Sequence, residues 1–220
     1  MSDFIHSLAK DGHVADVYVA KPESQAPAAV VILQEIFGIT DHIKDICNQY
    51  AAHGYLAVAP ALYDRIRKNI VLDYSSFAEG KDYKTQLNDE QTLMDIEAAI
   101  ALAEKDSKVA VVGFCFGGAL AYLASTRINL NCTISYYGGG IAEKYIHQKP
   151  LCPIMYHFGA LDAAIPLSEV AEIKSSHPEG VFHIYEGAGH GFNCNFREDY
   201  HEESANIASS RTLDFLKLHL

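Results

Sequence analysis

Residues 113–118 have the sequence Gly-Phe-Cys-Phe-Gly-Gly, which places one cysteine, Cys115, among three small residues. The apolar, β-branched run before it predicts a strand and the residues after it predict a helix, so Cys115 would stand on a sharp turn between the two. A nucleophile on such a turn has a strained backbone, and glycines beside it leave room for the strand and helix to pass closely. The start of a helix also favours a thiolate over a thiol. The pattern therefore predicts a nucleophile, although small residues around an inert, buried cysteine would look the same.

Two later segments supply the acid and the base that a nucleophilic thiol needs. Asp162 follows the apolar residues 153–158 and a glycine-containing turn, and His190 lies in the glycine-rich loop after residues 181–185. Both would lie at the carboxyl ends of strands, where open α/β sheets place their sites. The order nucleophile, acid, histidine is that of the α/β-hydrolases. We therefore predict that His190 exchanges a proton with Cys115, and that Asp162 orients and stabilises the imidazole.

The rest of the chain alternates between predicted strands and helices. Strands are predicted at residues 14–19, 29–33, 55–59, 109–112, 131–136, 154–158 and 181–185, and helices at 41–52, 88–103, 117–126, 167–175 and 202–218. Asp41 would cap the first helix, Gly54 would end it, and Asn88 would open the second. Continuous apolar strands between helices indicate the α/β-hydrolase fold, with a mostly parallel central sheet of about eight strands and helices on both faces. We expect one domain over residues 1–220, with its least regular stretch, residues 63–87, as a flap over the site.

Composition and charge restrict the classes of function. The chain has 220 residues, a formal charge of −11 and five cysteines. The acidic balance argues against nucleic acid or an anionic membrane as a partner, and no apolar run reaches the length of a membrane span. An odd number of well-separated cysteines, with no signal sequence before them, favours reduced thiols in a cytoplasmic protein. We expect a monomer or weak homo-oligomer that acts on a small molecule.

Several short motifs together point to one family. They are Gln34-Glu35-Ile36-Phe37-Gly38, Ala59-Pro60-Ala61-Leu62-Tyr63, Gly113-Phe114-Cys115-Phe116-Gly117-Gly118-Ala119, Tyr136-Tyr137-Gly138, Gly159 with Asp162, and Gly189-His190 with Phe192. Through them the chain resembles the dienelactone hydrolase (carboxymethylenebutenolidase) family over nearly all of its length. The resemblance implies that Cys115, Asp162 and His190 form a catalytic triad. It also implies a fourth active-site residue, Glu35, which bonds to the cysteine at rest and takes up its proton when substrate arrives.

The same motifs suggest how a substrate would be held. The residue after the nucleophile and a residue of the loop after the third strand usually form the oxyanion hole, so the backbone N–H groups of Ile36 and Phe116 are predicted to do so. The candidate substrate-binding side chains are Phe37, Tyr137, Phe192 and Cys194. We expect neither a metal nor an organic cofactor.

The chain departs from the family pattern where the substrate carboxylate binds. The family has an arginine four residues after the catalytic histidine, and this chain has Cys194 there. Arg65, Arg67 and Lys68 are the cations in the segment that carries the family's other carboxylate-binding arginine. Arg197 could also supply the missing cation, but we expect it to be a solvated surface residue. A guanidinium binds a carboxylate with two parallel hydrogen bonds, which a cysteine cannot replace. The resemblance therefore predicts the catalytic residues but does not identify the substrate.

The function expected from these features is hydrolysis of a small activated ester or enol lactone through a thioester acyl-enzyme. Two alternatives remain open. One is a carboxylesterase or thioesterase of broader specificity, and the other is a non-catalytic α/β-hydrolase that serves as a binding module. His157, in the strand before Asp162, is expected to be an interior histidine with satisfied hydrogen bonds.

Overall fold

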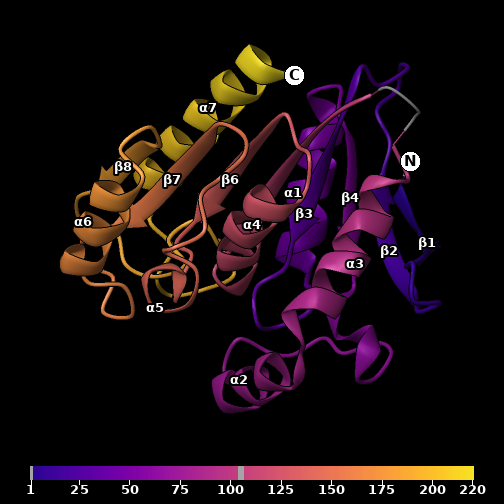
Figure 1. The fold of residues 1–220 in the computed structure, drawn as a ribbon, viewed down its shortest axis with the longest axis horizontal. Helices are drawn as coiled ribbons and strands as arrows, with labels where there is room; N and C mark the ends of the chain where they lie inside the picture. The colour runs from indigo at the N-terminus through magenta and orange to yellow at the C-terminus, as the bar shows by residue number, and fades with distance from the viewer. Residues whose placement is uncertain (1, 104–106) are drawn as a thin grey trace. The chain divides into compact units, whose positions relative to one another are not determined.

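The computed structural model describes residues 2–103 and 107–220. The chain divides into two compact units, residues 1–109 and residues 110–220 (Figure 1). Among the described residues, no helix is both long and apolar enough to cross a membrane.

The first unit contains four strands and the helices that pack on them. Its strands are β1 (Ser2–Leu8), β2 (Val14–Ala20), β3 (Ala28–Leu33) and β4 (Leu56–Pro60), in the order β1-β2-β4-β3. β1 and β2 are antiparallel, as are β2 and β4, whereas β3 and β4 are parallel. Its helices are α1 (Asp41–Ala52), the short 3-10 helix η1 (Leu62–Arg65), α2 (Phe77–Gln86) and α3 (Asp89–Ile100). Both α1 and α3 pack against the strands, on opposite faces (Figure 1).

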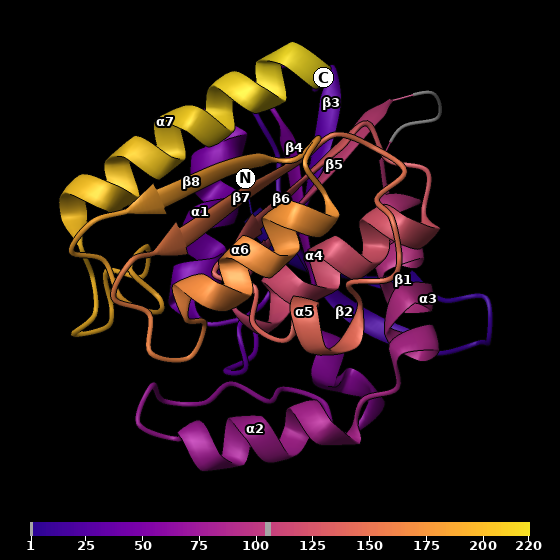
Figure 2. The same ribbon diagram turned by 60° about the vertical axis from the view of Figure 1, so that its left-hand side comes forward.

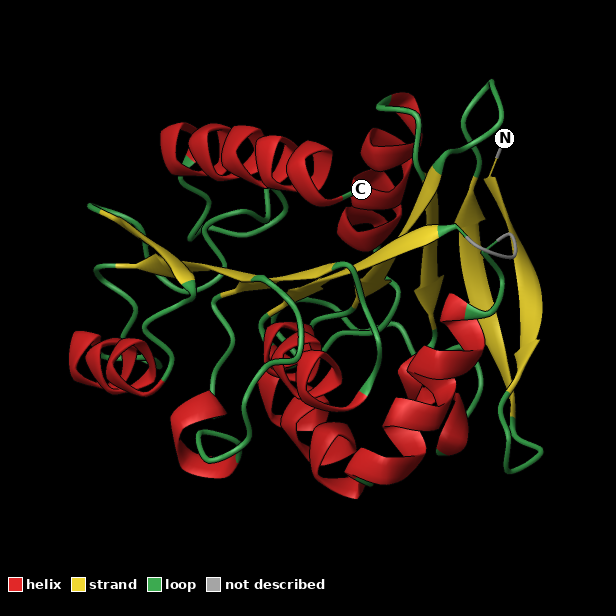
Figure 3. Ribbon diagram, turned by 45° about the horizontal axis from the view of Figure 1, so that its top comes forward, coloured by secondary structure: helices red, strands yellow, loops and turns green. Residues whose placement is uncertain are grey.

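The second unit is an alternation of parallel strands and helices. Its strands are β5 (Lys108–Phe114), which begins at the end of the first unit, β6 (Cys132–Tyr136), β7 (Ile154–Gly159) and β8 (Val181–Tyr185). They pair in that order, and every pairing is parallel. Its helices are α4 (Phe116–Arg127), α5 (Ile141–Lys144), α6 (Leu167–Ser176) and α7 (Glu202–His219). α7 covers one face of the strands, and α4 and α6 cover the other (Figures 2 and 3).

Most of the predicted elements are present within one or two residues. The prediction of about eight mostly parallel strands is confirmed, since the described residues contain four strands in each unit. β6 and β7 are buried at every position, as continuous apolar strands between two layers of helices should be. The prediction of one domain over residues 1–220 stays a prediction.

Several local predictions were wrong. α2 was missed, because residues 63–87 were predicted only as the least regular stretch of the chain, and of α2 only Gly80 is buried. A helix with so little buried surface lacks the apolar periodicity from which a helix can be predicted. β1 and the four-residue α5 were also missed, and the second predicted helix ends at Ile100 rather than at residue 103.

The helix caps were predicted with mixed success. Thr40, in extended conformation, is the N-cap of α1, and Asp41 is the first helical residue, where its negative charge still suits the positive end of the helix. Gly54 has φ +92° just past the end of α1, as predicted. The side chain of Asn88 accepts a hydrogen bond from the backbone N–H of Gln91 at 3.2 Å, which confirms the predicted cap of α3.

Candidate active site

Cys115 stands on the turn between β5 and α4, in the conformation that its flanking glycines predict. It is the N-cap of α4 with φ 54° and ψ −113°, a strained region for any residue with a side chain. A Cβ atom at Gly113 would lie 1.9 Å from the carbonyl oxygen of Gly117, and a Cβ atom at Gly118 would lie 2.5 Å from that of Tyr136. Glycine is therefore required at both positions. The backbone N–H of Cys115 donates to the Tyr136 carbonyl at 3.0 Å, which fixes the turn to the end of β6.

The second unit brings Cys115, His190 and Asp162 together in one hydrogen-bonded row. Nε2 of His190 lies 3.0 Å from Sγ of Cys115, and Nδ1 of His190 lies 2.8 Å from Oδ2 of Asp162. Asp162 is 4% exposed. The imidazole therefore lies between a thiol and a buried carboxylate, as nucleophilic catalysis with an oriented base requires.

Hydrogen bonds within the loop that carries Asp162, and between it and the loop that carries His190, hold both loops in place. The second carboxylate oxygen of Asp162 accepts hydrogen bonds from the backbone N–H groups of Ala164 at 2.8 Å and Ile165 at 3.1 Å. The backbone N–H of Leu161 donates to the carbonyl of Ala188 at 2.9 Å, which joins the loop after β7 to the loop after β8. The carboxylate therefore has a fixed orientation before any substrate binds.

The charge state of His190 follows from its two partners. Burial alone lowers the pKa of His190, because it disfavours the charged ring. The negative charge of Cys115 and the hydrogen bonds to Asp162 and Cys115 outweigh burial and raise this pKa to about 10. The two partners therefore favour the protonated form of the His190 ring.

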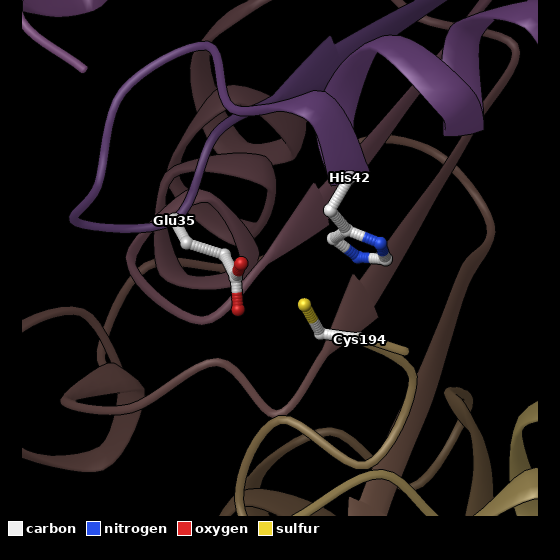
Figure 4. Close-up of side chains that lie close together, drawn as sticks. All are labelled: Glu35, His42 and Cys194. Carbon is white, nitrogen blue, oxygen red and sulfur yellow. The ribbon is translucent and has the colours of Figure 1, made fainter. Parts of the chain in front are cut away.

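Glu35 lies in the first unit, in the loop after β3, and is completely buried. The buried side chain of His42, from the first turn of α1, points toward it (Figure 4). A carboxylate oxygen of Glu35 and a ring nitrogen of His42 lie within 4.8 Å of each other. The next residue, Ile36, is fixed by its carbonyl, which accepts a hydrogen bond from the hydroxyl of Tyr63 at 3.0 Å. The active-site roles predicted for Glu35 and for the backbone N–H groups of Ile36 and Phe116 stay predictions.

The four candidate substrate-binding side chains, Phe37, Tyr137, Phe192 and Cys194, are all completely buried. In the second unit, the ring of Tyr137 lies 5.2 Å from that of His190 and 5.4 Å from that of Phe192, between centroids. Tyr137 has φ +37°, which is uncommon for so bulky a residue. In the first unit, Phe37 makes edge contacts with Tyr74 and Phe77. Their roles in binding a substrate stay predictions.

Two of the three candidate cations in the first unit are committed to carboxylates. Arg65 makes a two-point contact with Asp95, at 2.6 and 2.8 Å, and also pairs with Asp11 at 2.8 Å. Lys68 pairs with two carboxylates, those of Asp16 and Asp64, at 2.9 and 2.8 Å. The third cation, Arg67, is exposed and donates a hydrogen bond to the hydroxyl of Tyr83 at 3.1 Å.

The expectation that Arg197 is a solvated surface residue was wrong. Its side chain is 6% exposed and pairs with Asp199 at 3.0 Å. Its guanidinium packs against the backbone of Gly191, where an added Cβ atom would lie 2.5 Å from Nη1. This cation therefore lies beside the residue that follows His190. This burial could not be predicted from the sequence, because the contact depends on how the loop after β8 folds back.

Comparisons with known proteins show the family to which the chain belongs. A sequence model described as the dienelactone hydrolase family matches residues 15–220. A carboxymethylenebutenolidase of Pseudomonas putida is 33% identical over 94% of this chain and 92% of its own, and a candidate carboxymethylenebutenolidase of Yersinia pestis is 32% identical over 97% and 87%. A crystal structure of a candidate dienelactone hydrolase from Klebsiella pneumoniae superimposes with a TM-score of 0.86 at 28% identity, covering 97% of both chains. The predicted α/β-hydrolase fold is thereby confirmed, and the chain belongs to the dienelactone hydrolase family.

Proposed function

We propose that this hydrolase cleaves small activated esters or enol lactones with Cys115 as nucleophile, His190 as acid and base, and Asp162 as the residue that orients the imidazole. The row of contacts from Sγ to Nε2 at 3.0 Å and from Nδ1 to Oδ2 at 2.8 Å is the observation that carries the proposal. It supplies a nucleophile, a proton acceptor and an orienting anion within hydrogen-bonding reach of one another.

The reaction would proceed in two halves. In the first, the Cys115 thiolate attacks the carbonyl carbon, the C–O bond to the leaving oxygen breaks, and the His190 imidazolium gives that oxygen its proton. A thioester between the acyl group and Cys115 remains. In the second half, neutral His190 takes a proton from water while the water oxygen attacks the thioester carbon, and the C–S bond breaks to release the acid. The imidazolium and the thiolate are then restored.

The negative oxygen that forms in each half needs donors that are in place beforehand. Phe116 is the first residue of α4 and directly follows the proposed nucleophile, Cys115. Its N–H, together with that of Ile36, would receive the oxyanion. We also propose that the Cys115 thiol keeps its proton until substrate binds, that Glu35 then takes this proton to give the thiolate, and that Glu35 returns it to the sulfur after the acid is released, on the strength of its place in the shared Gln-Glu-Ile-Phe-Gly motif.

One observation favours broad specificity within this class. The family position for a carboxylate-binding arginine is held by Cys194, and Arg65 is engaged by two carboxylates of the protein itself. An esterase or thioesterase that accepts neutral substrates is therefore the second candidate. A thioester intermediate restricts either enzyme to acyl groups with a good leaving group, since a plain alkyl ester lies lower in free energy than the thioester.

Trapping the acyl-enzyme tests the proposal. Mixed with an activated aryl ester, the protein should release a burst of aryl alcohol stoichiometric with enzyme, and mass spectrometry should locate the acyl group on Cys115. Cys115→Ala should abolish both signals. Cys132→Ala is the matched control, because burial, helped by the charge of Cys152, raises the pKa of Cys132 to about 12 and leaves this thiol unreactive. Full activity in Cys115→Ala would refute the assignment.

A further inference from the structure

Four buried polar side chains are linked behind the triad, inside the second unit. They are Tyr136 at the end of β6, His157 in β7, Tyr185 at the end of β8 and Thr212 in α7. Nδ1 of His157 lies 2.8 Å from the hydroxyl of Tyr185, and Nε2 lies 3.0 Å from the hydroxyl of Thr212. The Thr212 hydroxyl lies 2.6 Å from that of Tyr136. The four side chains therefore tie three neighbouring strands to the helix that covers them (Figure 2).

The chemistry of this network requires an uncharged histidine. Burial lowers the pKa of His157 well below its usual value, and nearby His183 and Arg211 lower it further. A neutral imidazole has one donor and one acceptor nitrogen, and hydroxyls on both sides can satisfy either tautomer. At the open end of the row, the guanidinium of Arg211 lies over the ring of Tyr185, 5.4 Å from its centroid. Every member therefore has a partner, which is the condition under which a buried polar network becomes rigid.

The main chain of the strand residues in the network holds the triad. The carbonyl of Tyr136 accepts the backbone N–H of Cys115 at 3.0 Å, and that of His157 accepts the N–H of Tyr137 at 2.7 Å. The ring of Tyr137 in turn lies against His190. The carbonyl of Tyr185 accepts the N–H of Ala160, two residues before Asp162, at 2.9 Å. Cys115 is thus bonded to the network directly through its backbone, His190 is linked to it through Tyr137, and Asp162 is linked to it through Ala160, two residues earlier.

We propose that Tyr136, His157, Tyr185 and Thr212 form a positioning network that sets the spacing of Cys115, His190 and Asp162, with Thr212 as the point where α7 is fastened to it. This inference rests on the proposed function, because it assigns a role relative to that triad. Its physical basis is that a catalytic site tolerates only small displacements of its reacting groups. A displacement of about 0.5 Å in the ends of β6 or β8 moves the nucleophile or the base out of productive geometry.

Thr212→Val tests the network with little change in packing, since valine has the shape of threonine without the hydroxyl. It removes the partner of both His157 and Tyr136. We expect kcat with an activated aryl ester to fall about tenfold or more while KM stays within about twofold. The rate of Cys115 alkylation by iodoacetamide should also need a higher pH to reach its maximum, because a displaced imidazolium stabilises the thiolate less. Thr212→Ser, which restores the hydroxyl, should recover most of both.

Tyr122→Phe is the matched control. Tyr122 also has a buried hydroxyl that contacts a histidine, His177, and the carbonyl of Gln148, but none of these residues holds the triad. The Tyr122→Phe variant should have a Tm lowered as much as that of Thr212→Val, with kcat and the pH dependence of Cys115 alkylation unchanged. Should Thr212→Val fail to fold, Tyr185→Phe breaks the opposite end of the row.

Wild-type kcat and an unchanged alkylation profile in Thr212→Val, with a loss of Tm equal to that of Tyr122→Phe, would show that the network serves stability only. Failure of the proposed function would look different, because Cys115→Ala would then keep its activity whatever happens at Thr212.

Discussion

Replacing Asp162 by asparagine should keep the positions of the three side chains but exchange the donor and acceptor roles of the two ring nitrogens of His190. One carboxylate oxygen accepts the N–H groups of Ala164 and Ile165, and the other faces Nδ1 of His190 at 2.8 Å. The amide oxygen of an asparagine must stay with the two N–H donors, because an NH2 group cannot accept them. The NH2 group then faces Nδ1, which becomes the acceptor, and the ring proton moves to Nε2. Nε2 lies 3.0 Å from Sγ of Cys115 and, once protonated on a neutral ring, cannot accept the thiol proton.

The expected loss is smaller than in a serine enzyme. The corresponding change in a Ser-His-Asp protease lowers kcat about 10⁴-fold. A cysteine thiol, with an ordinary pKa near 8.5, still ionises in part without help from the imidazole. We therefore expect kcat to fall about 10²- to 10³-fold, which corresponds to about 3–4 kcal/mol of activation free energy at about 1.4 kcal/mol per tenfold.

Steady-state hydrolysis of an activated aryl ester between pH 6 and 9 measures this loss. The residual rate of Asp162→Asn should rise with pH as the thiol ionises on its own. Asp214→Asn is the control, because Asp214 lies exposed on α7 and pairs only weakly, at 3.4 Å, with Lys217. A kcat for Asp162→Asn within threefold of wild type would refute the argument from tautomers and, with it, the role given to this carboxylate.

Three further outcomes follow from the site. Glu35→Gln should preserve the fold and lower kcat for an enol lactone more than it raises KM, and a wild-type kcat from pH 6 to 8 would show that Glu35 is structural. Because the pKa of His190 is raised to about 10, the stability from its charged form should be complete below its unfolded pKa of about 6.5 and disappear as pH rises toward 10. Thermal unfolding of Cys115→Ala should show a smaller loss over that range, and an identical loss would contradict the pairing. Cys194→Arg should lower KM for anionic lactones and not for neutral esters, whereas Arg197→Gln should raise it for anionic lactones if Arg197 has taken over the carboxylate. Equal effects on both substrate classes would exclude this role for either position.

The sequence predicted those features that depend on local sterics or on apolar runs. Cys115 adopts a positive φ between Gly113 and Gly118, because the clearance that these glycines provide is a property of the turn itself. The buried strands of the second unit were predicted almost to the residue, since a strand covered on both faces must be apolar throughout. Elements with little buried surface, such as α2, could not be found in this way.

Contacts between polar residues that lie far apart in the chain could not be predicted from the sequence. His157 was expected to be an interior histidine with satisfied hydrogen bonds, which is confirmed, but its partners Tyr185 and Thr212 lie 28 and 55 residues away. No periodicity or spacing relates such positions. The burial of Arg197 was missed for the same reason, because it depends on a loop that returns to pack on Gly191.

The arrangement of the second unit separates the chemistry from the choice of substrate. Cys115, His190 and Asp162 contact one another directly, and the bonds that hold their loops come from strand ends and from the backbone. None of these bonds uses the side chain at position 194, whose backbone makes an ordinary turn contact with Gly191 at 2.9 Å. The contacts among Cys115, His190 and Asp162 are therefore made without the side chain at position 194. If the reaction depends on those three residues and affinity for a carboxylate depends on a separate cation, as we propose, the charge of the substrate can change while the mechanism is kept.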